Sequence, residues 1–449
     1  MSEIFDNISK KTYISLALSF FFYLGISYGI ERSEFYMLLF LYTGLFIAFL
    51  VLVQENKDNN KFLFLISIAF RLLLLFAIPN LSDDFYRFIW DGRMSWQGLN
   101  PYLYLPENNP ELVAEGVELY QGMGSMNGSH FTCYPPVNQF AFLIPAVLFA
   151  KNLLGSTVVM RLVLVLADIG TYIYGKKIID YLKIPSYKIF FYMLNPFVIL
   201  ELTGNLHFEG VMIFFLAISL YFLFKKKELF SAVFFAVAVS VKLIPLLFLP
   251  LLLKLLGSKK SIHYFSIVLL LNVLFFVPFM SHELYDNFMK SIHLYFQNFE
   301  FNASIYYLVR EIGFWVKGYN IIHIVGKVTP IIVFCAVMLV ALLRKNANPK
   351  VLMSSMLFAI CIYYSLASIV HPWYIAIPLF FSVCTRYKFP LVWSFFTILS
   401  YAAYQQDIYQ ENLYLLVIEY VVVYSVLTYE LVCFKKLKTV FNSYSVFLD

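Results

Sequence analysis

The chain is expected to fold as an all-α, polytopic bundle of transmembrane helices. Of its 449 residues, 61% are hydrophobic and only 13% are charged, whereas soluble domains have about 45–50% apolar and about 25% charged residues. Apolar runs of about 20 residues recur along the chain, and this is the length that an α-helix needs to cross a bilayer. Lysines and arginines cluster in the gaps between those runs, as they do in the cytoplasmic loops of membrane proteins.

Taken in chain order, the apolar runs predict about 13 spans. Segment 229–256 is interpreted as a pair broken by proline. Segment 138–150 is too short to cross, so we expect it to re-enter the membrane or to lie at its interface. The expected spans are residues 12–30, 35–53, 62–79, 155–175, 188–203, 206–224, 229–256, 262–280, 321–343, 350–370, 372–385, 389–405 and 413–434.

Basic clusters occupy every second gap between these spans, which predicts that those gaps and both termini face the cytoplasm. The outer gaps then include two long polar loops, 80–137 and 281–318, within a single membrane domain of residues 1–449. Long connections of this kind are usually functional. The expected location is therefore the cytoplasmic (inner) membrane, with an active site on the extracytoplasmic side.

Several other classes of protein are disfavoured. The net charge of +6 reflects the loop lysines and is no sign of nucleic-acid binding. Four of the five cysteines lie in apolar runs, and only Cys133 lies in a polar loop, so no disulfide framework is implied. A glycine-rich phosphate loop and a βαβ pattern are both missing, which disfavours a soluble nucleotide-sugar enzyme.

Segment 82–102, at the start of the first outer loop, places ionisable residues directly after an apolar run. Ser82 is a suitable N-cap, so Asp83 and Asp84 are expected in the first turn of a helix that Gly98 ends. Apolar residues repeat at helical spacing along one face. We expect an amphipathic helix on the outer membrane surface, with its acidic face toward protein or water.

The polar face of that helix carries both signs of charge. Arg87 lies three residues after Asp84 and four before Asp91, close enough to pair with either. These residues are either an ordinary helix start with a solvated face or a functional cluster. Charges kept beside a membrane exit are costly and usually mark chemistry or transport, and the later Tyr102 and Tyr134 favour the functional interpretation.

Further polar residues lie in apolar surroundings at breaks between runs. Asn205, His207 and Glu209 occupy a predicted outer turn, where they either cap the turn or belong to a functional site. Lys242 lies where Pro245 breaks an apolar run. Because a proline lets the chain turn back within the membrane, this lysine either has a functional role at the break or snorkels to the surface.

A later outer turn contains His371, Trp373 and Tyr374. Interfacial tryptophan and tyrosine commonly anchor membrane proteins, so this turn is either an anchor or part of a binding surface. Arg71 and Arg161 lie inside or at the ends of apolar runs and are expected to snorkel or to pair helices, with the lone acids Asp168 and Glu419 as candidate structural partners.

The order of these motifs resembles a known family. An acidic pair closely followed by tyrosine, a Tyr-Pro-Pro segment at 134–136, and the segments 205–210 and 371–374 occur in the part of the chain from about residue 60 to 385. This ordered set resembles the GT-C superfamily of integral-membrane glycosyltransferases. Within that superfamily it is similar to bacterial polyprenyl-phosphate-mannose-dependent mannosyltransferases.

The resemblance implies an inverting glycosyltransferase with an aspartate as general base. Asp83 matches that aspartate, and Asp84 is the second choice. The donor would be a hexose, with mannose expected, on a polyprenyl phosphate. A leaving phosphate needs cations or hydrogen-bond donors, for which Arg87, Arg93 and Lys242 are candidates.

The expected partners are this donor, a glycan or lipid acceptor and membrane lipid, with no nucleic acid. No cofactor and no obligatory metal are expected, because the two acids are adjacent and do not form a chelating Asp-x-Asp. The alternatives are a transporter or flippase of lipid-linked sugars and a surface-polysaccharide polymerase or ligase. Further substrate contacts are expected from Asp91, Tyr102, Tyr134, Asn205, His207, Glu209, His371, Trp373 and Tyr374.

Overall fold

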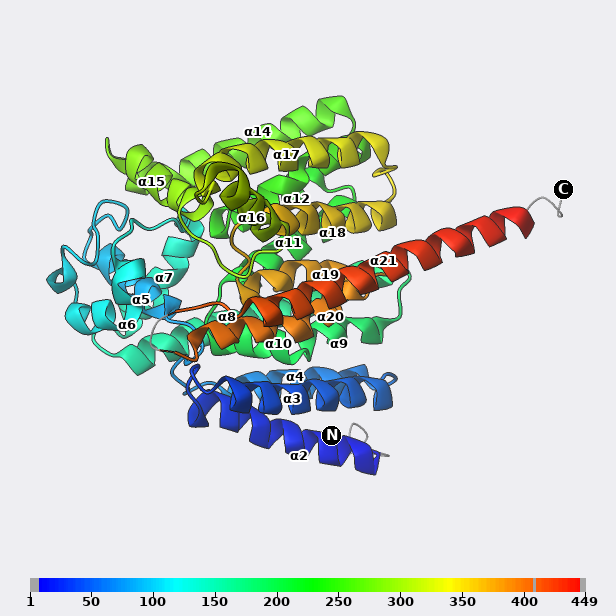
Figure 1. The fold of residues 1–449 in the computed structure, drawn as a ribbon, viewed down its shortest axis with the longest axis horizontal. Helices are drawn as coiled ribbons and strands as arrows, with labels where there is room; N and C mark the ends of the chain where they lie inside the picture. The colour runs from blue at the N-terminus through cyan, green and yellow to red at the C-terminus, as the bar shows by residue number, and fades with distance from the viewer. Residues whose placement is uncertain (1–7, 407–408, 445–449) are drawn as a thin grey trace.

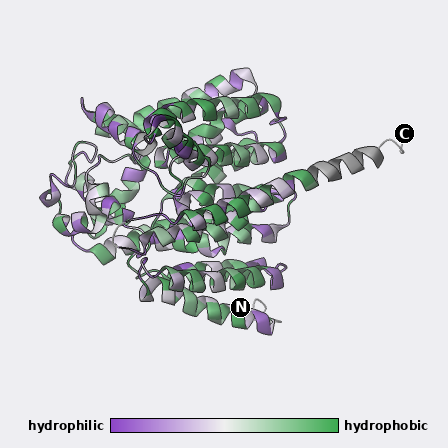
Figure 2. Ribbon diagram, in the orientation of Figure 1, coloured by the Kyte–Doolittle hydropathy of each residue, from purple (hydrophilic) through white to green (hydrophobic). Residues whose placement is uncertain are grey.

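A computed structural model describes residues 8–406 and 409–444, and these form helices that lie side by side (Figure 1). Within those ranges no β-strand forms, and Phe301 and Ile369 make an isolated parallel bridge. Hydrophobic residues run along nearly every helix (Figure 2). The predicted all-α class is therefore confirmed.

The first three helices lie together at one edge of the molecule (Figure 1). They are α2 (Lys10–Leu24), which continues into a π-helical turn at Gly25–Gly29, α3 (Phe35–Glu55) and α4 (Asn60–Leu73). A short polar turn containing Arg32 joins α2 to α3. Helix α4 corresponds to the predicted span 62–79 but ends at Leu73, before the first outer loop begins.

The first outer loop folds into a compact group of helices at one end of the bundle (Figure 1). These are α5 (Asp84–Trp96), a 3-10 turn at Pro110–Leu112, α6 (Gly116–Gly128) and α7 (Pro136–Leu148). The second outer loop forms α15 (Leu284–Gln297) and α16 (Ile305–Lys317). Asn287 and Ser291 of α15 donate hydrogen bonds to the carbonyls of Tyr102 and Phe131, at 3.1 and 2.6 Å, so the two outer loops are in contact.

The remaining helices form the body of the bundle. In chain order they are α8 (Leu153–Tyr181), α9 (Phe190–Met193), α10 (Pro196–Val198), α11 (Glu209–Phe224), α12 (Glu228–Val241), a 3-10 segment Ile244–Leu252, α13 (Leu253–Leu256), α14 (Ser258–Phe276), α17 (Ile322–Leu343), α18 (Pro349–Leu366), α19 (Ala376–Val383), α20 (Phe389–Phe396), a 3-10 segment Thr397–Tyr404 and α21 (Leu413–Tyr444).

A buried ion pair ties α4 to α8. Arg71 Nε lies 2.6 Å from Asp168 Oδ2, and both side chains are almost fully buried. Arg71 also donates to the carbonyl of Met193, 2.7 Å away. A charge in an apolar interior is tolerated when it is paired and hydrogen-bonded, and of the two candidate acids Asp168 is the one that pairs with Arg71.

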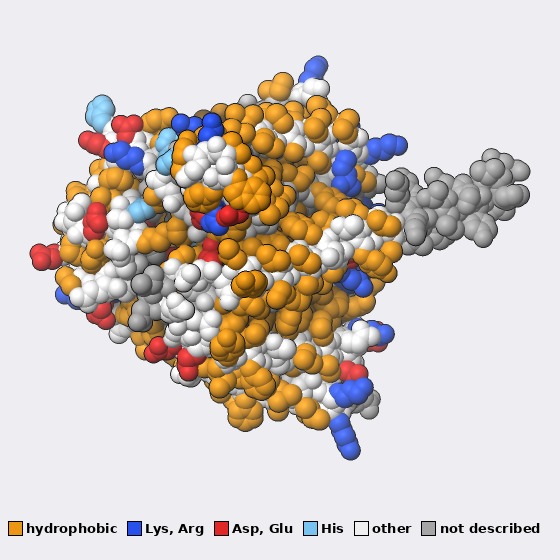
Figure 3. Space-filling view, in the orientation of Figure 1, with side chains coloured by type: hydrophobic (Ala, Val, Ile, Leu, Met, Phe, Trp, Pro, Cys, Tyr) orange, Lys and Arg blue, Asp and Glu red, His pale blue; other side chains and the backbone are white. Residues whose placement is uncertain are grey.

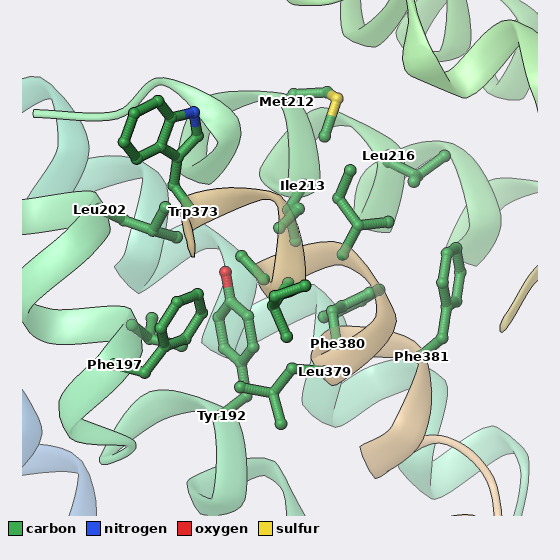
Figure 4. Packing of buried hydrophobic residues seen from close by; sticks show 14 of the residues in the cluster. Tyr192, Phe197, Leu202, Met212, Ile213, Leu216, Trp373, Leu379, Phe380 and Phe381 are labelled. Carbon is green, nitrogen blue, oxygen red and sulfur yellow. The ribbon is translucent and has the colours of Figure 1, made fainter. Parts of the chain in front are cut away.

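A bend before α11 and the short helix α19 both lie in the interior of the bundle. The chain bends by 111° between Pro196–Gly204 and α11, which places the turn 205–208 at the bend. Helix α19 is buried on every side, and its Leu379, Phe380 and Phe381 pack among residues of α9, α10 and α11 (Figure 4). A short helix that is hydrophobic all round is expected in such a core position.

Seven of the described helices are long and apolar enough to cross a membrane, or eight if the bent pair counts as one span. The prediction of about 13 passes is not confirmed, because segments 229–256, 372–385 and 389–405 form helices shorter than 18 residues. Prolines interrupt the first of these segments. On the face shown in Figure 3, Lys and Arg side chains gather mainly at the end of the bundle opposite the first outer loop.

Candidate functional site

The acid pair lies at the start of α5. Asp83 is the residue that precedes the helix, and its side chain makes no capping hydrogen bond. The Asp84 N–H donates to Ser82 Oγ at 3.4 Å. The predicted N-cap is therefore wrong by one residue: Asp83 occupies that position, and Ser82, just before it, accepts the hydrogen bond from the first residue of the helix. This leaves the Asp83 carboxylate available for other contacts.

The apolar face of helix α5 is covered by protein, contrary to the prediction that it lies in the membrane interface. Phe85, Phe88, Ile89 and Trp90 are buried, and α5 packs against α6 and α7. The Phe88 ring stacks on Phe142 of α7 with centroids 4.6 Å apart. An amphipathic pattern has the same appearance whether protein or lipid covers its apolar face, and here protein covers it.

The polar face of α5 is buried as well. Arg87 Nε lies 2.7 Å from Asp91 Oδ1, and this acid also accepts a hydrogen bond of 3.0 Å from Gln139. Arg87 further donates to the carbonyls of Asn127 and His130. Of the two acids within its reach, Arg87 therefore pairs with Asp91, and the interpretation of this face as solvated is wrong.

Asp84 faces a different environment from Asp83. Asn127 Nδ2 donates to its carboxylate at 3.3 Å. Burial raises the pKa of Asp84 from 3.8 to about 6, while the nearby Lys242 partly opposes this shift. Asp84 is thus a carboxyl group whose pKa lies close to neutral pH.

A cavity of about 500 Å³ opens beside the acid pair, and we call it the central cavity. Its wall combines the start of α5 with segments from the second outer loop, with Lys242 just after α12 and with the turn before α19. Aromatic side chains form much of the lining. Eight predicted site residues contribute to it, namely Asp83, Asp84, Arg87, Tyr134, Lys242, His371, Trp373 and Tyr374.

Lys242 follows α12, where the backbone becomes extended. Its ammonium group pairs with the Glu209 carboxylate and lies 4.7 Å from the centroid of the Tyr374 ring. Its side chain is 22% exposed, whereas that of Glu209 is almost fully buried. Glu209 therefore holds the lysine in place beside the cavity, and the break before Pro245 positions it there.

The turn at 371–374 forms a stack of rings. Trp373 lies between His371 and His207, with centroid distances of 4.5 and 3.6 Å. Burial, and then the charge of Lys242, lower the pKa of His371 to about 3, so its imidazole is neutral at physiological pH. Its Nδ1 has no hydrogen-bond partner among the residues that the structure describes. This ring is therefore a candidate contact for a polar substrate group.

Arg32 joins the site although the sequence interpretation did not select it. Its Nη2 lies 2.6 Å from Asp83 Oδ2, and its guanidinium lies 4.6 Å from the centroid of the Tyr404 ring. Both Arg32 and Asp83 are about one-third exposed. One signal was available, because Arg32 falls in a gap that the alternation of basic clusters places outside.

Six predicted site residues do not line the central cavity. Three of them support residues that do: Asp91 holds Arg87, Glu209 holds Lys242, and His207 stacks on Trp373. The other three make these contacts: Arg93 pairs with Glu115 at 2.8 Å, the Tyr102 hydroxyl donates to the carbonyl of Tyr134, and Asn205 accepts from the N–H of Leu81.

The buried turn 203–210 also carries a second polar network. Tyr401 lines the central cavity, and its hydroxyl donates to Glu201 Oε1 at 2.6 Å. Asn205 Nδ2 lies 3.4 Å from Glu201 Oε2. Glu201 is therefore a supporting acid that the sequence interpretation missed, since it lies inside an apolar run. No group of three or more potential metal ligands occurs in the described part of the chain.

Comparison with known proteins identifies the family of this chain. Residues 25–257, just over half of the chain, match the family described as alpha-(1->6)-mannopyranosyltransferase, N-terminal domain. Alpha-(1->6)-mannopyranosyltransferase A of Corynebacterium glutamicum is 25% identical over 186 residues, which cover 39% of this chain and 35% of that protein. The chain thus aligns with about a third of the length of this relative.

No solved structure matches the chain. The family match includes Arg32, the acid pair, the turn 203–210 and Lys242. These residues line or support the central cavity. The chain therefore belongs to the alpha-(1->6)-mannopyranosyltransferase N-terminal domain family.

Proposed function

We propose that this protein transfers a mannosyl residue from a polyprenyl phosphate to a glycan or lipid acceptor on the outer side of the cytoplasmic membrane. The observation that carries the proposal is the convergence of the acid pair and Lys242 on one cavity, in a chain of this family. The alpha-(1->6)-mannopyranosyl transfer in the name of the Corynebacterium glutamicum relative is extended here to this chain.

Asp83 is the proposed general base. Arg32 contacts its carboxylate through Oδ2, which leaves Oδ1 to accept the proton of an acceptor hydroxyl. The side chain is 37% exposed and so can be reached by an acceptor. Asp84 already accepts a hydrogen bond from Asn127. Its proposed role is to balance the charge of Lys242.

The leaving phosphate needs positive charge close to the bond that breaks. Lys242 supplies an ammonium group at the cavity wall, and His371 offers a neutral imidazole with an unpartnered nitrogen. Trp373 and Tyr374 line the same cavity, where the parts of their side chains that face it can contact the donor. Arg87 lines the same cavity, but its pairing with Asp91 makes it a supporting residue.

The proposed reaction is a single displacement. The acceptor oxygen attacks the anomeric carbon as its proton passes to Asp83, and the bond from that carbon to the phosphate oxygen breaks. The electron pair leaves with the polyprenyl phosphate, and the new glycosidic bond forms on the opposite face. Such a displacement inverts the anomeric carbon, so an alpha product requires a beta-linked donor.

The test uses the full chain in lipid nanodiscs with radiolabelled polyprenyl-phosphate mannose and octyl α-1,6-mannobioside as acceptor. The expected result is transfer by the unaltered protein and a loss of about 100-fold or more in Asp83→Asn, the size of effect typical for a general base. Asp180→Asn is the matched control, because Asp180 forms an exposed ion pair with Lys176 at the far end of α8.

Each part of the proposal can fail separately. Undiminished transfer by Asp83→Asn would remove the base assignment while leaving the enzyme assignment intact. If the unaltered protein transfers glucose from its polyprenyl phosphate but not mannose, the donor assignment is wrong. Absence of transfer from any polyprenyl-phosphate hexose, with donor still bound, would overturn the proposed activity.

A further inference from the structure

A second cavity of about 660 Å³ lies beside the central cavity, and we call it the polar cavity. Residues from four parts of the chain line it, one of which supplies Tyr404, Gln406 and Tyr409 between α20 and α21. Glu31 and Ser33 come from the turn between α2 and α3, Asn80 from the segment after α4, and Tyr86 from α5. It is therefore assembled where the N-terminal helices meet the first outer loop.

The two cavities share a wall. Arg32, Asp83 and Tyr404 line both of them. The Arg32–Asp83 ion pair of 2.6 Å and the Arg32 guanidinium above the Tyr404 ring join these three side chains into one contact. The proposed base consequently lies between the two spaces, whereas Asp84 lines only the central cavity.

The lining of the polar cavity indicates what it can bind. Its charged residues are two carboxylates, Glu31 and Asp83, against the single guanidinium of Arg32. This balance disfavours an anionic ligand such as a phosphate. The hydroxyl of Ser33 and the phenol of Tyr86 can hydrogen-bond to hydroxyl groups, and the ring of Tyr404 provides a flat apolar surface. A neutral ligand with many hydroxyl groups fits this chemistry.

The frame of the polar cavity is well supported. Asn80 Nδ2 donates to the carbonyls of Ile26 and Ile30, at 2.6 and 2.7 Å. These bonds attach the segment before the acid pair to the π-helical turn that ends α2. The amide nitrogen of Asn80 is thereby occupied, while its oxygen remains able to accept a hydrogen bond.

We propose that the polar cavity binds the acceptor as a neutral glycan, and that Arg32 is a positioning residue that holds Asp83 in the wall between acceptor and donor. This inference rests on the proposed function, because it assigns the two substrates to the two sides of the proposed base. A base in that wall can receive the proton of a hydroxyl that enters from the polar cavity.

The first experiment measures occupancy of the polar cavity without requiring catalysis. Ser33→Cys is introduced into a cysteine-free version of the full chain in nanodiscs, and the rate of labelling by a maleimide is followed. Saturating octyl α-1,6-mannobioside should slow labelling at least about fivefold, whereas octyl sulfate should not. Ser258→Cys, at an exposed position at the start of α14, should label at the same rate with and without the glycoside.

The second experiment separates the two substrates by kinetics. Ser33→Trp should raise the acceptor KM about tenfold and leave the binding of radiolabelled polyprenyl-phosphate mannose unchanged. Ser258→Trp controls for an added tryptophan. Equal labelling rates with and without the glycoside, together with an unchanged acceptor KM, would overturn the assignment of the polar cavity.

The third experiment tests the positioning role of Arg32. Arg32→Gln should lower kcat about tenfold or more with donor binding unchanged, and Arg32→Lys should recover part of that loss, because an ammonium can still pair with Asp83. Arg310→Gln is the control, since it removes another partly buried ion pair, with Glu300 at 2.7 Å.

Failure of these tests can be told apart from failure of the proposed function. If the unaltered protein transfers mannose but the Arg32 and Ser33 variants behave as their controls do, only the present inference is wrong. If Arg32 had a purely structural role, Arg32→Gln would lower both the melting temperature and donor binding. Arg32→Lys would then not restore kcat separately from these two properties. Protection of the Ser33→Cys variant without any transfer would support the polar cavity as a glycan site and remove the enzyme assignment.

Discussion

Asp83 and Asp84 are neighbours in sequence, yet they face different surroundings. Successive positions of an α-helix are rotated by about 100°, and these two lie where the helix begins. Asp83 meets Arg32 from the N-terminal helices, whereas Asp84 meets Asn127 at the end of α6. Adjacent carboxylates can therefore take separate roles. Asp83 lies in the wall between the two cavities, and Asp84 lines only the central cavity.

The raised pKa of Asp84 predicts a pH dependence of stability. Because its pKa in the folded protein, about 6, lies above the ordinary value of 3.8, the folded state holds the proton more tightly between these limits. Stability should then fall as pH rises from about 4 to about 6 and level off above that. Asp84→Asn removes this slope and should gain up to roughly 3 kcal/mol relative to the unaltered protein at pH 7.

Thermal melts of the two proteins in the same detergent, taken from pH 4 to pH 7.5, check this prediction. The curves should converge at pH 4 and separate at neutral pH, while Asp180→Asn follows the unaltered protein. Melting temperatures of Asp84→Asn that stay parallel to those of the unaltered protein at every pH would contradict it.

At the scale of elements, the contact between α5 and α7 determines where the acid pair lies. A Cβ atom placed on Gly92 would lie 2.0 Å from the carbonyl oxygen of Phe142. Phe142 also meets the ring of Phe208, whose centroid is 5.0 Å away, next to the bend before α11. The first outer loop is thus packed directly against the broken helix that carries Glu209.

Gly92→Ala should push α5 away from α7, since the obstacle is backbone and cannot rotate aside. The expected cost is about 1–3 kcal/mol of stability, with a loss of transfer because the acid pair moves relative to Lys242. Gly29→Ala is the control, as a Cβ atom placed on Gly29 would have no neighbouring atom within 4 Å. Unchanged stability and transfer in Gly92→Ala would show that the two helices separate without cost.

Sequence patterns predicted these elements unequally well. The predicted start of helix α5 agrees with the observed start to within about one residue, because Ser-Asp-Asp before a helical repeat is a strong local signal. Its surroundings were not predicted, since the partner surface on α7 comes from residues more than 40 positions later. Segment 229–256 was expected to break at its prolines and does so, with Lys242 at the break.

At the scale of the whole molecule, charge is distributed along the bundle axis. Figure 3 shows Lys and Arg mainly at one end, and Asp and Glu mainly at the other, where the outer loops lie. This polarity agrees with the alternation of basic clusters in the sequence. Both cavities open at the end that carries the first outer loop.

The orientation predicts accessibility from the two sides of the membrane. In a cysteine-free chain, Glu118→Cys on α6 should react with a membrane-impermeant maleimide in intact cells. Lys183→Cys, exposed just after α8, should react only after the membrane is permeabilised. The reverse pattern would place the two cavities on the cytoplasmic side and would exclude the proposed outer active site.

The sequence by itself determined the all-helical membrane class, the alternation of basic loops and the local break at Lys242. Each of these follows from composition or from neighbours within a few residues, so a linear pattern contains the information. Only the tertiary structure decided that α5 is buried, that Arg87 pairs with Asp91 and not with Asp84, and that Arg32 contacts Asp83. Those outcomes depend on surfaces from distant parts of the chain. The partner of a charged side chain near a membrane exit is determined only when the helices pack together.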